Sequence, residues 1–233
     1  MDLIINSSIA VLGLCILVLL ARGPIRSYLV VFLYALVDAA SSIAEEIVWQ
    51  FRGRGDPILV NLFWVNEILL DVFLFVMVMA LIRRASDQPA LRSIAGKILP
   101  VVLAVSAVLP FVYGHSLLRF NQGGTTLSST FFNVTSQTLN FGGAIMNLVL
   151  WTALIGRKRR DPQLLAVSAG LGVIATGQAL YYGLQILVRP ASAMMRSFED
   201  ALEAATHVAG LAIWCWAFRP SANRQLTPNE KTS

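Results

Sequence analysis

Residues 58–82 read ILVNLFWVNEILLDVFLFVMVMALI, an apolar stretch interrupted by a few polar side chains. A helix needs about 20 apolar residues to cross the hydrocarbon layer of a membrane, so this stretch is long enough for one crossing. Asn61, Trp64, Glu67 and Asp71 recur at intervals of three and four residues, which places them on one face of a helix. The stretch therefore predicts a membrane-spanning helix with one polar face.

Six further stretches of similar character fill most of the remaining chain. They cover residues 3–21, 28–51, 93–113, 131–155, 163–187 and 198–218. The 233 residues are 56% hydrophobic and 13% charged, with a mean hydropathy of +0.68. This composition excludes a soluble enzyme, a disordered chain and a disulfide-stapled secreted module. We expect an all-α membrane protein, a bundle of seven transmembrane helices within residues 1–219, and a disordered cytoplasmic tail at 220–233.

The basic residues predict the orientation of this bundle. Arg22 and Arg26 follow the first apolar stretch, whereas Met1 to Ser8 contain no Lys or Arg, which favours a retained helix with its N-terminus outside over a cleaved signal peptide. With seven crossings, 13 of the 18 basic residues fall in internal segments and five in external ones. The internal residues are Arg22, Arg26, Arg83, Arg84, Arg92, Lys97, Arg157, Lys158, Arg159, Arg160, Arg219, Arg224 and Lys231, and the external ones are Arg52, Arg54, Arg119, Arg189 and Arg196. The expected location is the cytoplasmic (inner) membrane, with the C-terminus in the cytoplasm.

Polar stripes run along five of the seven stretches. An ionisable side chain inside a span costs about 2.5–3.5 kcal/mol on insertion, so such residues generally face a bundle interior. Besides the stripe of 58–82, the members are Asp38, Ser41, Ser42, Glu45, Glu46 and Trp49; Asn133, Ser136, Gln137, Asn140 and Asn147; Thr176, Gln178, Tyr181, Tyr182 and Gln185; and Glu203, Thr206, His207, Gly210 and Trp214. Together they predict an acidic cavity open to the outside.

We expect a small polar or cationic ligand to bind in this cavity. The candidate binding residues are Asp38, Glu45, Glu67, Asp71, Glu203, His207, Tyr181 and Asn140. Glu67 and Asp71 lie one turn apart, so at least one is expected to be protonated unless a cation or an Arg lies between them. By contrast, we assign Glu199 and Asp200 a structural role, because they begin the last stretch, where a carboxylate interacts favourably with the helix dipole.

The possible cofactors are few. Covalently bound retinal is excluded because the last stretch has no lysine; the lysines are Lys97, Lys158 and Lys231. Glu67, Asp71, Glu203 and His207 are candidate metal ligands, since carboxylates and an imidazole suit hard or transition-metal cations. This metal site has no further support from the sequence, because the apolar stretches contain neither a second histidine nor a repeated Glu-x-x-His pattern. The two cysteines, Cys15 and Cys215, are expected as thiols on neighbouring helices.

The sequence lacks the residues that nucleic-acid binding, zinc hydrolysis or serine-based catalysis would need. No aqueous basic surface is present for nucleic acid, although the net charge is +5. Two histidines cannot supply a three-His zinc site, and no Gly-x-Ser-x-Gly elbow is found. A nucleophile, base and oxyanion set for an enzyme cannot be assembled from these spans.

Several residues resemble those of a group of small bacterial seven-span membrane proteins without an established activity. They are Trp64 with Glu67, Gly170 with Gly172, and Ile213-Trp-Cys-Trp followed by Arg219-Pro220. The resemblance implies a seven-helix fold and carries over no functional site.

Three functions are compatible with these observations. The leading hypothesis is a binding or sensing module that signals through a cytoplasmic or membrane partner protein. The first alternative is a proton or cation conductor or transporter that uses the buried carboxylates and His207. The third is an accessory subunit of a membrane complex.

Overall fold

The computed structural model describes residues 2–53, 57–85, 126–155, 161–187 and 193–220, together with residues 97, 100, 101, 104, 105 and 108. The elements in these ranges are α1 (Asp2–Ala21), the short 3-10 helix η1 (Ile25–Ser27), α2 (Leu29–Arg52), α3 (Pro57–Ala85), α5 (Thr126–Ile155), α6 (Pro162–Leu187) and α7 (Ala193–Ala217). No strand occurs in the described part of the chain, so the prediction of an all-helical protein is confirmed there.

Most helices follow the predicted stretches closely, but two begin earlier. α5 begins at Thr126 and α7 at Ala193, five residues before the expected starts at 131 and 198. The additional turn of α5, Thr-Leu-Ser-Ser-Thr, is mostly polar, and hydropathy detects only the apolar part of a helix. The additional turn of α7 is Ala-Met-Met followed by Arg196 and Ser197, and these two polar residues interrupt the apolar stretch. The expected stretch at 93–113 lies mostly outside the described residues, as do the tail beyond 220 and most of the expected loop at 114–130.

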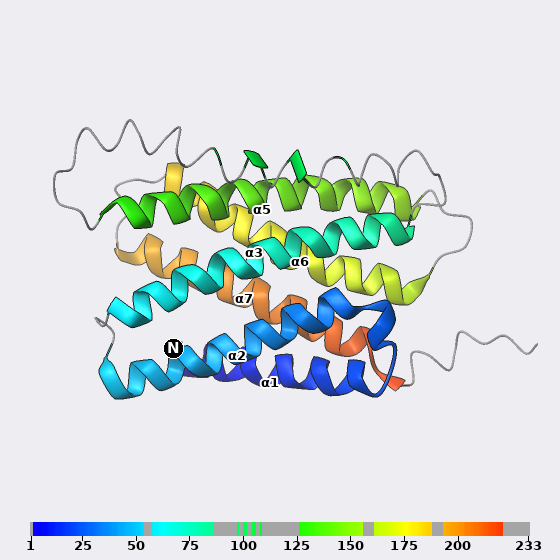
Figure 1. Cartoon of the computed structure of the whole chain (residues 1–233), viewed down its shortest axis with the longest axis horizontal. Coiled ribbons are helices and arrows are strands. Elements are labelled where there is room, and N and C mark those ends of the chain that lie inside the picture. Colours follow the sequence, from blue (N-terminus) through cyan, green and yellow to red (C-terminus); the bar gives the residue numbers. More distant parts are fainter. Residues whose placement is uncertain are drawn as a thin grey trace, which may run out of the picture.

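The described helices lie along a common axis and pack in a ring (Figure 1). Around this ring α1 packs on α2, α2 on α3, α3 on α5, α5 on α6 and α6 on α7, while α1 also contacts α7 and α3 contacts α6. α3 and α5 run in the same direction (Figure 1). Within the described residues, Trp64–Ala85 and Pro162–Leu184 are long and apolar enough to cross a membrane.

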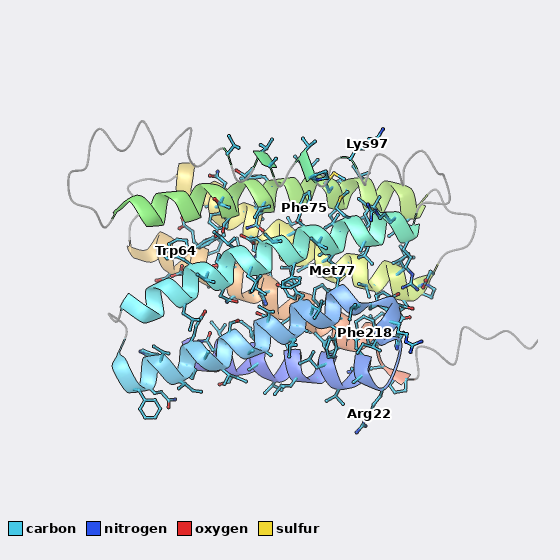
Figure 2. The ribbon with its side chains drawn as sticks, viewed as in Figure 1. Arg22, Trp64, Phe75, Met77, Lys97 and Phe218 are labelled. Atoms are coloured by element: carbon cyan, nitrogen blue, oxygen red, sulfur yellow. The ribbon has the colours of Figure 1, made fainter. Side chains whose placement is uncertain are left out.

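One half of the bundle has a mostly apolar core. We call it the Arg84 half, because Arg84 marks that end, and we call the other half the Gly53 half. Large side chains that are almost fully buried fill the Arg84 half, and Figure 2 labels two of them, Phe75 and Met77. Others are Ile16, Leu20, Tyr34, Leu74, Leu150, Leu164, Leu171, Ile174, Leu211 and Trp214. Close packing of this kind leaves little room for water.

Glycines bring α6 and α7 into backbone contact. A Cβ on Gly170 would lie 2.8 Å from the carbonyl oxygen of Gly210 and 2.6 Å from the indole of Trp214. A Cβ on Gly210 would lie 2.8 Å from the carbonyl oxygen of Gly170. Small residues at such crossings allow membrane helices to approach closely. The indole N–H of Trp214 also donates to the Val167 carbonyl at 2.8 Å, so α6 and α7 form a tightly joined pair.

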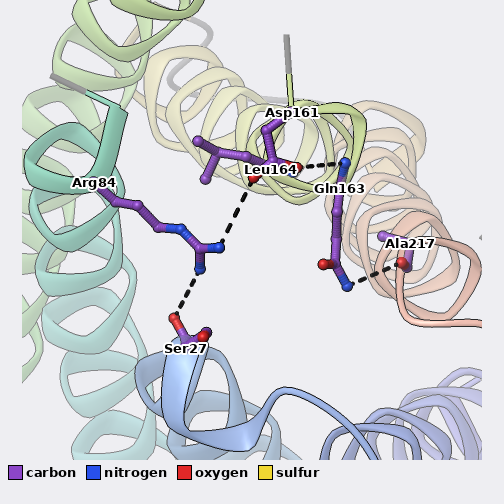
Figure 3. Close-up of polar contacts among 6 residues, drawn as sticks. All are labelled: Ser27, Arg84, Asp161, Gln163, Leu164 and Ala217. Atoms are coloured by element: carbon purple, nitrogen blue, oxygen red, sulfur yellow. Dashed lines mark hydrogen bonds and ion pairs between the residues drawn. The ribbon is translucent and has the colours of Figure 1, made fainter. Parts of the chain in front are cut away.

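Polar contacts fasten the Arg84 end (Figure 3). The Arg84 guanidinium donates to the Ser27 carbonyl at 3.2 Å, lies 3.8 Å from the Asp161 carboxylate and stacks 4.5 Å above the Tyr28 ring. The Gln163 amide donates to the Ala217 carbonyl at 3.4 Å. This end of the bundle therefore gathers segments that the sequence predicts to be internal.

Candidate functional site

The predicted polar residues meet in the middle of the bundle, at the edge of the apolar core. Asp38 on α2 and His207 on α7 form the first contact, with 3.0 Å between Oδ2 and Nε2. Their side chains are only 4% and 12% exposed. Tyr34, one turn before Asp38, stacks on the His207 ring with a centroid distance of 6.4 Å. This pair links two helices that are far apart in sequence.

A second contact joins α3 to α6. The Tyr182 hydroxyl donates to Glu67 Oε1 at 2.9 Å, and both residues are buried. Tyr181, another predicted site residue, packs edge-on against the Tyr182 ring at 5.3 Å between centroids. The aromatic residues of the α6 stripe therefore border the carboxylate of Glu67.

Asp71 occupies a third position, between α3 and α5. It is 1% exposed, and Ser136 and Asn140 of α5, both fully buried, are its polar neighbours. Ser136 and Asn140 are within hydrogen-bonding reach of the Asp71 carboxylate, yet its two oxygens, the Ser136 hydroxyl and both Asn140 amide atoms make no hydrogen bond of regular geometry. Buried polar groups rarely remain unpaired, so these atoms mark a place where a further group is needed.

Glu203 and Glu45 complete the acidic set. Glu203 is one turn from His207 on α7, and Glu67 and His207 are its main charged neighbours. Glu45 lies toward the Gly53 half, where Asn66 Nδ2 donates to its Oε1 at 3.4 Å. The acids therefore extend from the middle of the bundle into the Gly53 half.

Five helices thus supply the predicted binding residues: Asp38 and Glu45 from α2, Glu67 and Asp71 from α3, Asn140 from α5, Tyr181 from α6, and Glu203 and His207 from α7. Among the side chains that the structure describes, His207 is the basic group that faces Glu67, Asp38 and Glu203. No group of three His, Cys, Asp or Glu side chains in the described residues is placed to hold a metal ion. The four candidate metal ligands, Glu67, Asp71, Glu203 and His207, therefore do not form such a group.

Two polar residues of the predicted stripes donate hydrogen bonds to backbone carbonyls of their own helices. The Ser41 hydroxyl donates to the Val37 carbonyl at 2.7 Å, and the Thr206 hydroxyl donates to that of Leu202 at 2.9 Å. Both hydroxyls therefore have local partners, which is common for Ser and Thr within helices.

The dipole role predicted for Glu199 and Asp200 needs correction. α7 begins at Ala193, and its first turn contains no acidic residue. The helix dipole acts mainly within the first turn, so it does not account for these acids. Glu199 is 3% exposed, and its Oε1 has no hydrogen-bond partner.

Tyr34 is the site residue that the sequence analysis missed. It is fully buried and touches both His207 and Trp214, the latter edge-on at 5.5 Å between ring centroids. Its position four residues before Asp38 places it on the polar stripe of α2. A search for any polar or aromatic residue on that stripe would have found it.

Comparisons with known proteins identify no relative: no protein family, no curated protein and no solved structure matches this chain. The function must therefore be argued from the site itself.

Proposed function

We propose that this chain is a seven-span integral membrane protein that binds a small organic cation in its acidic middle and signals through a partner protein. The observation that carries the proposal is the gathering of Asp38, Glu67 and Glu203 around a single histidine, His207. Such a group of buried acids is costly in a membrane, and a cationic ligand offsets that cost.

The arrangement of the helices supports seven crossings. α3 and α5 run in the same direction (Figure 1), so the chain has to return between Ala85 and Thr126. The described residues within 93–113 are helical, and Lys97 lies in the Arg84 half (Figure 2). With this return, the clustering of Arg22, Arg84 and Arg219 agrees with the positive-inside rule and an external N-terminus.

The position of the apolar core favours binding over conduction. A conductor needs polar groups or water along its whole length, whereas the Arg84 half is filled by side chains such as Phe75, Leu171 and Trp214. Two buried polar residues, Asn147 and Ser168, lie in that half. Closer to the Arg84 end the core is again aliphatic, with Leu150 and Leu164 fully buried.

A route for the signal follows from the same contacts. His207 stacks on Tyr34, Tyr34 packs against Trp214, and Trp214 is hydrogen-bonded to Val167. A cation that competes with His207 for Asp38 changes the first of these contacts. The effect then reaches α6 and α7 in the Arg84 half, where a cytoplasmic or membrane partner would respond.

Binding is tested by thermal unfolding of the purified full-length protein in detergent at a fixed sodium chloride concentration. The probes are methylamine, trimethylamine, tetramethylammonium and putrescine, with acetate as the anionic control. We expect at least one cation to stabilise the protein saturably, by about 2.7 kcal/mol at a concentration of 100 Kd. Glu67→Gln and Glu203→Gln should remove this effect, whereas Glu199→Gln, which changes a buried acid elsewhere on α7, should keep it.

Two results would contradict this proposal. One is the absence of stabilisation by all four cations beyond that of sodium chloride at equal ionic strength. The other is proton flux into reconstituted vesicles, measured with a pH-sensitive dye, that disappears in Glu67→Gln, because that result would favour the conductor.

A further inference from the structure

Five unpaired polar atoms lie together in the middle of the bundle. They are Oδ1 and Oδ2 of Asp71, Oγ of Ser136, and Oδ1 and Nδ2 of Asn140. The three residues are at most 1% exposed. A buried polar group left without a partner costs about 1–3 kcal/mol, and a charged group more. A further charged or hydrogen-bonding group among these atoms would offset that cost.

The surrounding side chains supply only part of what these atoms need. Ser136 and Asn140 approach the Asp71 carboxylate, and Ser136 also lies near the Tyr182 hydroxyl. The single O–H of Tyr182 is donated to Glu67 Oε1. One turn further along both helices, a Cβ on Gly143 would lie 3.2 Å from Leu74 Cδ2, so α3 and α5 approach closely there. The unpaired atoms are thus bordered on one side by an apolar contact and on the other by Tyr182, whose hydroxyl proton is already donated to Glu67.

The chemistry of these atoms suits a hard cation. Asp71 provides two carboxylate oxygens, Ser136 a hydroxyl oxygen and Asn140 an amide oxygen, and hard cations prefer oxygen ligands of these types. No thiol or imidazole is among the three, which disfavours a transition metal. One carboxylate balances one positive charge, so the charge of the site matches a monovalent ion.

We propose that Asp71, Ser136 and Asn140 bind a sodium ion between α3 and α5. Ser136 and Asn140 are one turn apart on α5 and both approach the Asp71 carboxylate. Because α3 and α5 come close together beside them, we expect the smaller sodium ion rather than potassium. The site is separate from the Asp38–His207 contact and does not depend on binding of an organic cation.

Sodium binding is tested on the purified full-length protein in detergent, with no organic cation added. Sodium chloride replaces potassium chloride at constant ionic strength, and binding of radioactive sodium is measured by equilibrium dialysis. We expect about one sodium ion per chain and a saturable rise in the thermal unfolding midpoint. Asp71→Asn should abolish both effects.

Ser136→Ala provides the second variant, because the Ser136 hydroxyl makes no hydrogen bond of regular geometry that the substitution would remove. We expect it to fold as the wild type does in potassium chloride and to bind sodium about tenfold more weakly, a loss of about 1.4 kcal/mol. Glu199→Gln should keep wild-type sodium affinity.

Three results would overturn the sodium site: no sodium binding by the wild type, equal stabilisation by sodium and potassium, or unchanged sodium affinity in both Asp71→Asn and Ser136→Ala. These results leave the organic-cation proposal standing, because that test is made at fixed sodium and uses Glu67→Gln and Glu203→Gln.

Discussion

The contact between Asp38 and His207 should be energetically coupled, which a double-mutant cycle of Asp38→Ala and His207→Ala can measure. Nε2 and Oδ2 are 3.0 Å apart, and the side chains are 12% and 4% exposed. Hydrogen bonds to charged groups contribute about 1.5–3 kcal/mol in soluble proteins, and hydrogen bonds between membrane helices average about 0.6 kcal/mol with a maximum of about 1.7 kcal/mol. Because this contact is short and shielded, we expect a coupling of about 1.5 kcal/mol.

The free energy of unfolding would be measured for the wild type, both single variants and the double variant, by reversible denaturation in mixed detergent micelles. His207→Ala also removes the ring that stacks on Tyr34. That loss occurs with and without Asp38, so it cancels in the cycle. Additivity within about 0.5 kcal/mol would refute the argument, since it would mean that the two side chains do not interact in the folded protein.

Two further predictions concern α6. Gly170→Ala should destabilise the protein by about 1–3 kcal/mol, because the added Cβ meets the Gly210 backbone and the Trp214 ring. Gly183→Ala is the matched control, since its Cβ would lie at an ordinary 3.7 Å from Phe141. Equal unfolding midpoints for the two variants would contradict the close α6–α7 contact. Asp161→Ala should cost about 0.5–2 kcal/mol, because its Oδ1 accepts from two backbone N–H groups at the start of α6. Asp161→Asn keeps that cap and loses only the partly exposed ion pair with Arg84, so a loss as large as that of Asp161→Ala would show that the ion pair dominates.

The sequence predicts the helices well because each carries a long apolar stretch. It also predicts which residues meet: helical spacing identifies the faces of Asp38, Glu67 and His207, and the cost of burying them indicates that these faces turn inward. Hydropathy does not reveal where a helix begins once the chain becomes polar. This is why the start of α5 was placed late, whereas at α7 Arg196 and Ser197 interrupt the apolar stretch after Ala-Met-Met.

The sequence does not predict which side chains contact one another within the site. Spacing along one helix does not specify the rotation of its neighbours, so nothing indicated that Tyr182 would pair with Glu67, or that Asp71 would face Ser136. The metal candidates illustrate the same limit. They share two helix faces, yet in the described structure no three of them lie close enough together to hold one metal ion.

The glycine contact between α6 and α7 has a mechanical consequence. Backbones that touch at Gly170 and Gly210, and that Trp214 joins by a hydrogen bond, resist sliding past each other. We therefore expect a displacement of His207 to move α6 and α7 together relative to α2, to which Asp38 connects α7. Such a movement would extend along both helices as far as Ala217 and Gln163, which are hydrogen-bonded at the Arg84 end.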